Sequence, residues 1–321
     1  MSPAANPIAE RLSRQPFIVL DGALATELER RGADLRDPLW SAKYLLESPD
    51  AIRAVHRDYF RAGADVATTA TYQATFEGFE RRGIGRDRAV RLMRDAVALA
   101  AEARDEFWAD PSHRRFRDRP LVAASVGPYG AMLADGSEYR GRYGVSDRVL
   151  GEFHRPRLEI LAGAGADLIA CETLPCLREA LVLARLLEEF PGLSAWISFS
   201  CRDGEHNCEG ERISDCAAAL RGLGQIAALG VNCTPPRHVA ALLGRMGAHA
   251  DKPLLAYPNS GEGYDARSKR WTGPAERGRV ADHVLEWYRA GARLIGGCCR
   301  TTPEDIGDVR AQVQALADLM V

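Results

Sequence analysis

The sequence predicts a (β/α)8 TIM barrel that forms a single domain. Eight short runs of apolar or β-branched residues recur along the 321 residues, and charged helical stretches separate them. Such runs, without strict polar alternation, are typical of parallel strands that are covered on both faces. A short repeat also joins helix to strand, because Ala-Gly-Ala and a charged residue stand at 62–65, 164–167 and 290–293. Eight strands with helices between them favour a barrel.

Helix starts, apolar stripes and strand-like runs justify the elements in order. Ser48 and Pro49 are typical of a helix N-cap and first turn, and Ile52, Val55 and Tyr59 follow at helical spacing. The glycine of each Ala-Gly-Ala repeat suits a helix C-terminus in left-handed conformation. The predicted strands are residues 17–20, 65–69, 121–125, 167–171, 195–200, 226–231, 253–256 and 293–296. Further helices are predicted at residues 86–107, 151–161, 177–190, 236–246, 279–288 and 303–319.

An open, doubly wound sheet is the alternative fold. Such a sheet usually has fewer strands and a glycine fingerprint after the first, whereas Leu-Asp-Gly-Ala at residues 20–23 contains no GxGxxG motif. Two long inserts, residues 127–146 and 259–272, follow the third and seventh strands, at the end where a barrel holds its active site. We assign residues 1–16 to an N-terminal extension or helix and residues 17–321 to the barrel.

Composition excludes several classes of partner. The chain is 46% hydrophobic and 27% charged, with a net charge of −2, so no nucleic-acid or acidic-substrate partner is indicated. It has neither a signal-peptide core nor a run near the ~18 apolar residues of a membrane span. We therefore expect a cytoplasmic protein with small-molecule substrates. Its eight cysteines should be reduced core residues or metal ligands rather than disulfides.

Three cysteines stand where two predicted strands end. Cys298 and Cys299 follow the eighth strand and Cys233 follows the sixth, and alternate strands of a barrel can meet across its mouth. Adjacent cysteines pair poorly as a disulfide but suit a soft metal ion. Three thiolates would leave a tetrahedral Zn²⁺ with one open position, which is the pattern of a catalytic site.

Other interpretations of these cysteines remain open. Cys233 could be a small core residue, which is the commonest fate of a buried cysteine. Cys171, Cys201, Cys208 and Cys216 are rival ligands, and Cys201 is the most credible substitute because it also follows a strand. Cys171 should point away from the barrel axis if its neighbour Glu172 points in.

A zinc ion with three thiolates suits one kind of chemistry. Such a centre is a poor Lewis acid for water but can bind a fourth thiolate and keep it deprotonated. The expected reaction is therefore alkylation of a substrate thiol. Nothing in the sequence matches a Ser-His-Asp arrangement, and none of the seven histidines falls at a predicted strand end.

Carboxylates and aromatic rings surround the predicted metal site. Asp21 and Glu172 lie near the mouth without an adjacent cation, so they could cap helices, form structural ion pairs or hold the ammonium group of an amino-acid substrate. Backbone amides near Gly22 could take its carboxylate. Aromatic residues near this face mostly pack, but a subset could enclose an onium methyl donor by cation–π attraction. They are Trp40, Tyr72, Phe76, Tyr129, Tyr139, Tyr143 and Tyr257.

Motifs along nearly the whole chain resemble the homocysteine S-methyltransferase family, especially its bacterial S-methylmethionine-dependent members. The resemblance rests mainly on two motifs, Gly-Val-Asn-Cys at 230–233 and Leu-Ile-Gly-Gly-Cys-Cys-Arg-Thr-Thr-Pro at 294–303. Matching stretches also occur at residues 20–23, 37–43, 71–75, 125–130, 134–141, 170–175 and 257–262. Cys201, Cys208 and Cys216 lie outside the family pattern, and we assign them no role.

The resemblance implies a zinc-dependent reaction that forms methionine from homocysteine. It implies zinc on Cys233, Cys298 and Cys299, homocysteine contacts from Asp21, Gly22 and Glu172, and Asn232 beside the metal. We add Trp40 and Tyr72 as substrate-binding residues. The expected donor is S-methylmethionine, with S-adenosylmethionine as a possible second. Betaine-using relatives carry an extra C-terminal oligomerisation segment, so we expect neither betaine nor that oligomer here, but a monomer or weak homodimer.

Two alternatives to this function remain. One is a methyltransferase for selenocysteine or another thiol, which relative rates with homocysteine and selenocysteine would separate. The other is a non-catalytic zinc- or thiol-binding module, which would bind thiols without forming methionine. We further expect Gly296 and Gly297 to let the barrel wall approach the metal, at some cost in backbone strain.

Overall fold

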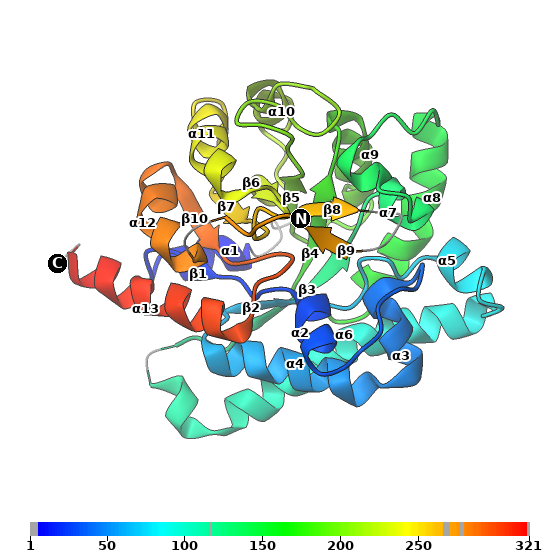
Figure 1. The fold of residues 1–321 in the computed structure, drawn as a ribbon, viewed down its shortest axis with the longest axis horizontal. Helices are drawn as coiled ribbons and strands as arrows, with labels where there is room; N and C mark the ends of the chain where they lie inside the picture. Colours follow the sequence, from blue (N-terminus) through cyan, green and yellow to red (C-terminus); the bar gives the residue numbers. More distant parts are fainter. Residues whose placement is uncertain (1–5, 116, 266–269, 277–278, 320–321) are drawn as a thin grey trace.

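A computed structural model describes residues 6–115, 117–265, 270–276 and 279–319, and it contains the predicted barrel (Figure 1). Eight parallel strands pair in the order β1-β10-β7-β6-β5-β4-β3-β2. A parallel bridge between Leu20 and Val66 then joins the first strand to the second and closes the ring. The strands are β1 (Ile18–Val19), β2 (Val66–Thr68), β3 (Leu121–Val126), β4 (Leu168–Leu174), β5 (Ala195–Phe199), β6 (Ile226–Asn232), β7 (Leu254–Tyr257) and β10 (Ala292–Ile295).

Helices ring the strands, as Figure 1 shows. None of the described helices combines the length and apolar character needed to cross a membrane. The helices are α1 (Pro7–Leu12), α2 (Leu24–Arg30), α3 (Tyr44–Glu47), α4 (Pro49–Ala62), α5 (Phe76–Glu80), α6 (Arg86–Ala109), α7 (Tyr129–Leu133), α8 (Asp147–Ala162), α9 (Leu177–Leu187), α10 (Ile213–Ala219), α11 (Pro236–Gly247), α12 (Val280–Arg289) and α13 (Pro303–Leu319). Short 3-10 helices are η1 (Trp40–Lys43), η2 (Pro111–Arg114) and η3 (Ser137–Tyr139).

All eight predicted strands and the predicted helices occur, with ends shifted by a few residues. The insert at residues 259–272 contains more than a loop, because β8 (Gly263–Asp265) and β9 (Arg270–Thr272) form an antiparallel hairpin there. Residues 266–269 of that insert lie outside the described part. Four short helices had no signal in the sequence, namely α2, α5, α7 and α10, which are five to seven residues long. Segments this short carry little periodicity.

The Ala-Gly-Ala repeat closes the amino end of the barrel. Gly63 and Gly291 have φ of 123° and 108°, so the predicted positive-φ glycines are confirmed there. The charged residues that follow add a second function: Asp65 accepts a hydrogen bond from the Val19 amide at 2.9 Å, and Asp167 accepts one from Val122 at 2.7 Å. Each carboxylate thus ties its own strand to the start of a neighbour. The predicted N-cap Ser48 stands before α4, but its side chain makes no capping hydrogen bond.

The barrel has an inner and an outer apolar layer. Ile18, Leu168 and Leu294 belong to the inner cluster, to which α1 adds the fully buried Ile8. The outer layer packs the strands against the surrounding helices. Tyr257 marks the carboxyl end of the inner cluster. Because apolar packing fills the barrel interior, polar chemistry is left to the loops beyond the carboxyl ends of the strands.

Candidate active site

A cavity opens at the carboxyl ends of the strands. Eight of the nine predicted site residues line it, namely Asp21, Gly22, Trp40, Tyr72, Glu172, Cys233, Cys298 and Cys299, and Asn232 does not. Four carboxylates lie on its wall, those of Asp21, Asp37, Glu138 and Glu172. Asp37 pairs with Arg82 at 2.6 Å, and the described residues that line the cavity include no Lys, Arg or His. The cavity therefore favours cationic ligands.

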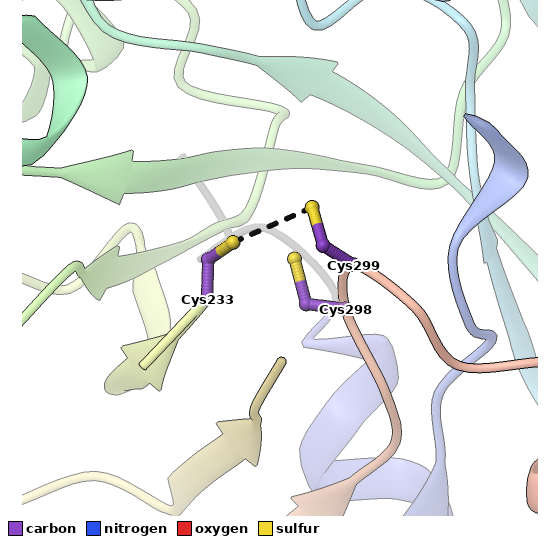
Figure 2. A group of neighbouring side chains, drawn as sticks. All are labelled: Cys233, Cys298 and Cys299. Atoms are coloured by element: carbon purple, nitrogen blue, oxygen red, sulfur yellow. Dashed lines mark hydrogen bonds between the residues drawn. The ribbon is translucent and has the colours of Figure 1, made fainter. Parts of the chain in front are cut away.

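The three predicted thiols converge in this cavity. Cys233 comes from the end of β6, and Cys298 and Cys299 follow β10, so the two segments flank β7 (Figure 2). The sulfur atoms of Cys233 and Cys299 are 3.5 Å apart, and all three lie within 4.8 Å of one another. Hydrogen bonds from Cys298 and Cys299 lower the pKa of Cys233, so the cluster already favours one thiolate.

The backbone at Cys233 explains why its side chain turns inward. Its φ is 46°, in the left-handed region that non-glycine residues seldom occupy. Its amide donates to the carbonyl of Tyr257 at 3.1 Å, and the amide of Cys298 donates to Pro258 at 2.7 Å. Both ligand-bearing segments are therefore fastened to the end of β7, which fixes the spacing of the thiols. Backbone strain concentrated at a site of this kind is typical of functional residues.

The backbone strain predicted at Gly296 and Gly297 was wrong, because neither has a positive φ, whereas their approach to the metal stays a prediction. A Cβ at Gly296 would lie 2.6 Å from Leu20 Cβ, and one at Gly297 would lie 2.3 Å from Thr301 Oγ1. The glycines thus allow close packing against the first strand and the start of α13. The positive φ values fall on Cys233, Thr173 and Arg300 instead.

The donor set suits a zinc ion. At a Zn–S distance of about 2.3 Å, the sulfur atoms of a tetrahedral site are about 3.8 Å apart. The three thiols are close to that spacing, and they are buried or nearly so. Three soft thiolate ligands with room for a fourth ligand favour zinc over hard cations such as magnesium or calcium.

Glu172 stands in a network of hydroxyl groups. Its carboxylate accepts hydrogen bonds from Ser125 Oγ and, at 3.0 Å, from Tyr257 Oη. Tyr257 Oη in turn accepts from Trp196 Nε1 at 3.0 Å. Burial raises the pKa of Glu172 to about 7, and the two hydroxyls oppose this only in part. A cationic ligand in the cavity would stabilise its ionised form.

Asp21 is buried in a similar way at the end of β1. Its carboxylate accepts from the Thr68 amide at 2.8 Å and from the Thr68 hydroxyl at 3.1 Å. Burial raises its pKa well above the usual range, and the charge of Glu172 adds to the rise. Gly22 follows with no room for a side chain, since a Cβ would lie 2.9 Å from both Thr301 Oγ1 and Tyr59 Cε1.

Asn232 lies next to the thiol cluster and hydrogen-bonds to Thr173. Its side-chain oxygen accepts from the Thr173 amide at 2.7 Å and from Ser198 Oγ at 2.8 Å. Its Nδ2 donates to Thr173 Oγ1 at 2.8 Å and lies 3.9 Å from Cys298 Sγ. Asn232 therefore holds Thr173 in its left-handed conformation next to Glu172, with its amide directed at one thiol.

Aromatic residues cover the cavity, and not all of them were predicted. Trp40 and Tyr72 pack edge to face with centroids 6.0 Å apart. Tyr139, from η3, brings its hydroxyl within 3.1 Å of Cys233 Sγ. The hairpin contributes Tyr264 and Trp271, which sequence reasoning missed. Of the other aromatic candidates, Tyr257 lines the cavity, whereas Tyr129 and Tyr143 pack on each other and Phe76 lies under Arg86.

The remaining cysteines stand apart from the thiol cluster. Cys171 packs in the outer layer while Glu172 faces the cavity, as the strand alternation predicts. Cys201 and Cys208 line a second cavity, which shares Cys233, Tyr139 and Tyr264 with the first. Cys216 is buried in α10. All eight cysteines are free, as expected.

Comparisons with known proteins agree with this site. The family model described as homocysteine S-methyltransferase matches residues 18–313. A homocysteine S-methyltransferase of Bacillus subtilis is 54% identical over 97% of this chain and 99% of its own length. A selenocysteine Se-methyltransferase of Brassica oleracea is 47% identical over 90% of this chain and 87% of its own length.

A solved structure agrees equally well. The metallated form of the homocysteine methyltransferase MmuM from Escherichia coli superposes with a TM-score of 0.86 and 47% identity, over 95% of this chain and 99% of that one. The thiol cluster together with this metallated relative matches a zinc-dependent enzyme. By sequence, fold and site, this chain belongs to the homocysteine S-methyltransferase family, whose reaction is methyl transfer to homocysteine.

Proposed function

We propose that this enzyme transfers a methyl group from a methylsulfonium donor to homocysteine and forms methionine. The donor is S-methylmethionine, with S-adenosylmethionine as a second. One observation carries the proposal: three convergent thiols share a cavity with four carboxylates, and the described lining includes no basic side chain. Such a cavity suits a sulfonium donor and two ammonium groups better than it suits an anionic or neutral donor.

Cys233, Cys298 and Cys299 would hold zinc, which supplies a Lewis acid that keeps a bound substrate thiol deprotonated. Asp21 and Glu172 take the ammonium group of homocysteine. Their buried carboxylates have hydroxyl and amide partners, so an ammonium ion would be their first cationic partner in the cavity. Backbone amides near Gly22 take the carboxylate of homocysteine, and Asn232 holds Thr173 and lies next to Cys298.

The reaction is a direct displacement. The homocysteine thiolate attacks the donor's methyl carbon; a new S–C bond forms, the sulfonium S–C bond breaks, and its electron pair stays on the donor sulfur. S-methylmethionine would thus yield two molecules of methionine. Trp40 and Tyr72 present ring faces and edges to the cavity and help to exclude water. The rate gain is mostly orientation of thiolate, methyl and leaving sulfur in a line.

A methionine-formation assay tests this proposal. Homocysteine is offered with S-methylmethionine, S-adenosylmethionine or betaine, and zinc is measured on the same sample. We expect turnover with the two sulfonium donors, fastest with S-methylmethionine, none with betaine, and one zinc ion for each chain. A metal-free protein with full activity, or betaine as the preferred donor, would contradict the proposal.

A second candidate acceptor is selenocysteine. The relative from Brassica oleracea favours it, and carboxylates that hold an ammonium group do not distinguish sulfur from selenium. We expect homocysteine to react faster, and a rate comparison of the two acceptors decides the point.

Three broader expectations belong to the same proposal. The enzyme works in the cytoplasm on small molecules, which its free cysteines and near-neutral charge support. It is a monomer or weak homodimer without nucleic-acid or membrane partners. The molar mass from light scattering, measured over a range of protein concentrations, tests the oligomeric state. The boundary at residue 16 between extension and barrel also stays a prediction.

A further inference from the structure

Glu138 is a cavity carboxylate that the reaction outlined above does not use. It lies in η3, in the insert between α7 and α8, and is 8% exposed. Its Oε2 is buried and has no hydrogen-bond partner among the described residues. Burial raises the pKa of Glu138 to about 7, and the nearby Cys233 adds to the rise. A buried carboxylate oxygen without a donor is costly unless a ligand supplies one.

Neighbouring groups do not meet this need. Arg140 lies two residues further on, but its guanidinium pairs with Asp135 at 3.3 Å and its side chain is 61% exposed. The hydroxyl of Ser200 donates to the backbone carbonyl of Glu138 rather than to its carboxylate. Since the described lining of the cavity contains no basic residue, the missing donor comes with a substrate.

The methyl donor has two cationic groups, a sulfonium and an ammonium, and only one of them can be the missing hydrogen-bond donor. A sulfonium centre carries no N–H or O–H group, whereas an ammonium group offers three hydrogen-bond donors and a positive charge. The unpartnered Oε2 therefore suits an ammonium group. The sulfonium itself is better matched to the aromatic rings of Tyr72, Tyr139 and Tyr264, which need no hydrogen bond.

Glu138 belongs to a different side of the cavity from the pair assigned to homocysteine. Asp21 and Glu172 stand at strand ends, and the charge of Glu172 adds to the rise in the pKa of Asp21. Glu138 stands on the insert that covers the mouth, beside Tyr139, whose hydroxyl touches Cys233. Cys233 also borders the second cavity, which Tyr139 and Tyr264 share. Glu138 therefore lines the same cavity as Asp21 and Glu172, but it comes from the insert rather than from a strand end.

We propose that Glu138 binds the α-ammonium group of the methyl donor, so that the enzyme selects sulfonium donors that are themselves amino acids. This assignment rests on the proposed function and adds the donor's recognition residue to it. The quaternary ammonium group of betaine carries no N–H, and simple sulfonium salts have no ammonium group, so both would leave Oε2 without a hydrogen-bond donor.

The test compares two donors that differ only in the amino group: S-methylmethionine and its deamino analogue 4-(dimethylsulfonio)butanoate. For Glu138→Gln we expect kcat/KM with S-methylmethionine to fall about 100-fold, which is the loss typical of a charged hydrogen bond. With the analogue, the variant and the wild type should agree within about twofold. Zinc content, thermal stability and the KM for homocysteine should stay unchanged.

Glu152→Gln is the matched control, because it makes the same chemical change in α8, at a side chain that is 60% exposed and pairs only with the exposed Arg148 among the described residues. It should behave as wild type with both donors. Equal losses of Glu138→Gln with both donors, a raised KM for homocysteine, or no loss at all would each overturn the assignment. A wild-type enzyme that forms no methionine from any sulfonium donor would instead overturn the proposed function.

Discussion

Buried carboxylates at the two ends of the barrel differ in whether the protein supplies them with a cationic partner. At the amino end, Asp65 is buried yet fully paired: it accepts from the Val19 amide and forms ion pairs with Arg310 and Arg117. Burial alone would raise its pKa, but the two arginines hold the pKa below the usual range. Asp167 is likewise paired with Arg104 at 3.0 Å.

At the carboxyl end, the buried carboxylates of Asp21 and Glu172 have amide and hydroxyl partners, but the described lining of the cavity offers them no cation. The pKa of Asp21 and of Glu172 is raised by burial, and the latter reaches about 7. The difference indicates what each end does. Charges at the amino end are satisfied within the protein and stabilise it, whereas charges at the mouth are completed by ligands.

The largest expected effect is loss of the metal. Cys298→Ser or Cys299→Ser should lose zinc together with about 1000-fold in activity, because a thiolate ligand is removed while the packing around it is kept. Metal analysis, circular dichroism and the methionine assay on one preparation measure this. Cys216→Ser, in α10, is the matched control and should keep its zinc. A zinc-loaded, active Cys298→Ser variant would contradict the assigned ligands.

At the amino end, Asp65→Asn should lower the free energy of unfolding by about 3 kcal/mol, because it removes the buried charge that pairs with the half-buried Arg117 and Arg310. The kcat/KM of the folded fraction should not change. Urea denaturation measures the first quantity. Asp50→Asn, in an exposed ion pair with Arg53, should cost less than about 1 kcal/mol. An Asp65→Asn variant that is stable but inactive would contradict the view that carboxylates at the amino end serve stability and those at the mouth serve ligand binding.

At the mouth, Glu172→Gln should raise the KM for homocysteine about 100-fold without loss of stability. In the free protein, the folded pKa of about 7 exceeds the ordinary 4.5, so this carboxyl's contribution to stability is present below pH 4.5 and is lost as pH rises through 7. Homocysteine needs the ionised form, so its binding should strengthen over the same rise. Glu172→Gln should remove that pH dependence, and binding titrations at pH 6 and pH 8 check it.

The smallest effect concerns His56 in α4, whose two ring nitrogens have no hydrogen-bond partner among the described residues. Burial lowers its pKa to about 4 from 6.5. The neutral form is therefore favoured in the fold, and its contribution to stability is present above pH 6.5 and is lost as pH falls. At 1.36 kcal/mol per unit, the loss at pH 5 is about 2 kcal/mol. Urea denaturation at pH 7 and pH 5 measures it.

His56→Leu should flatten this pH dependence and leave activity unchanged. The result sharpens the comparison, because His56 lies away from the cavity. His56 and Glu138 are both buried and lack hydrogen-bond partners among the described residues, but only Glu138 lines the cavity. An effect of His56→Leu on stability alone would show that such a group points to ligand binding only when it faces a cavity. A pH-independent wild type between 5 and 7 would contradict the prediction.

The regular parts of the molecule were predictable because their signals are local. Strand runs and helix stripes located the barrel, and barrel geometry then placed Cys233 near Cys298 and Cys299. The same reasoning placed Asp21 and Glu172 in one cavity. These residues all stand at strand ends, whose positions follow from the fold.

The cover of the site was less predictable because it depends on loops. Glu138, Tyr264 and Trp271 come from two inserts, and sequence spacing says nothing about which residues of an insert reach the cavity. The insert at residues 127–146 was placed at the correct end, and Tyr139 was among its aromatic candidates, but its contact with Cys233 was not foreseen. The close packing of Gly296 was not foreseen because its neighbour Leu20 is distant in sequence.

The position of the thiols in the chain has a consequence for how the enzyme assembles. Cys233 and Cys299 are 66 residues apart, and β7 lies between the strands that carry them. The cluster therefore exists only when the last three strands have docked side by side. A chain that has not completed its barrel offers scattered thiols with weak affinity for zinc, so metal uptake reports that folding has finished.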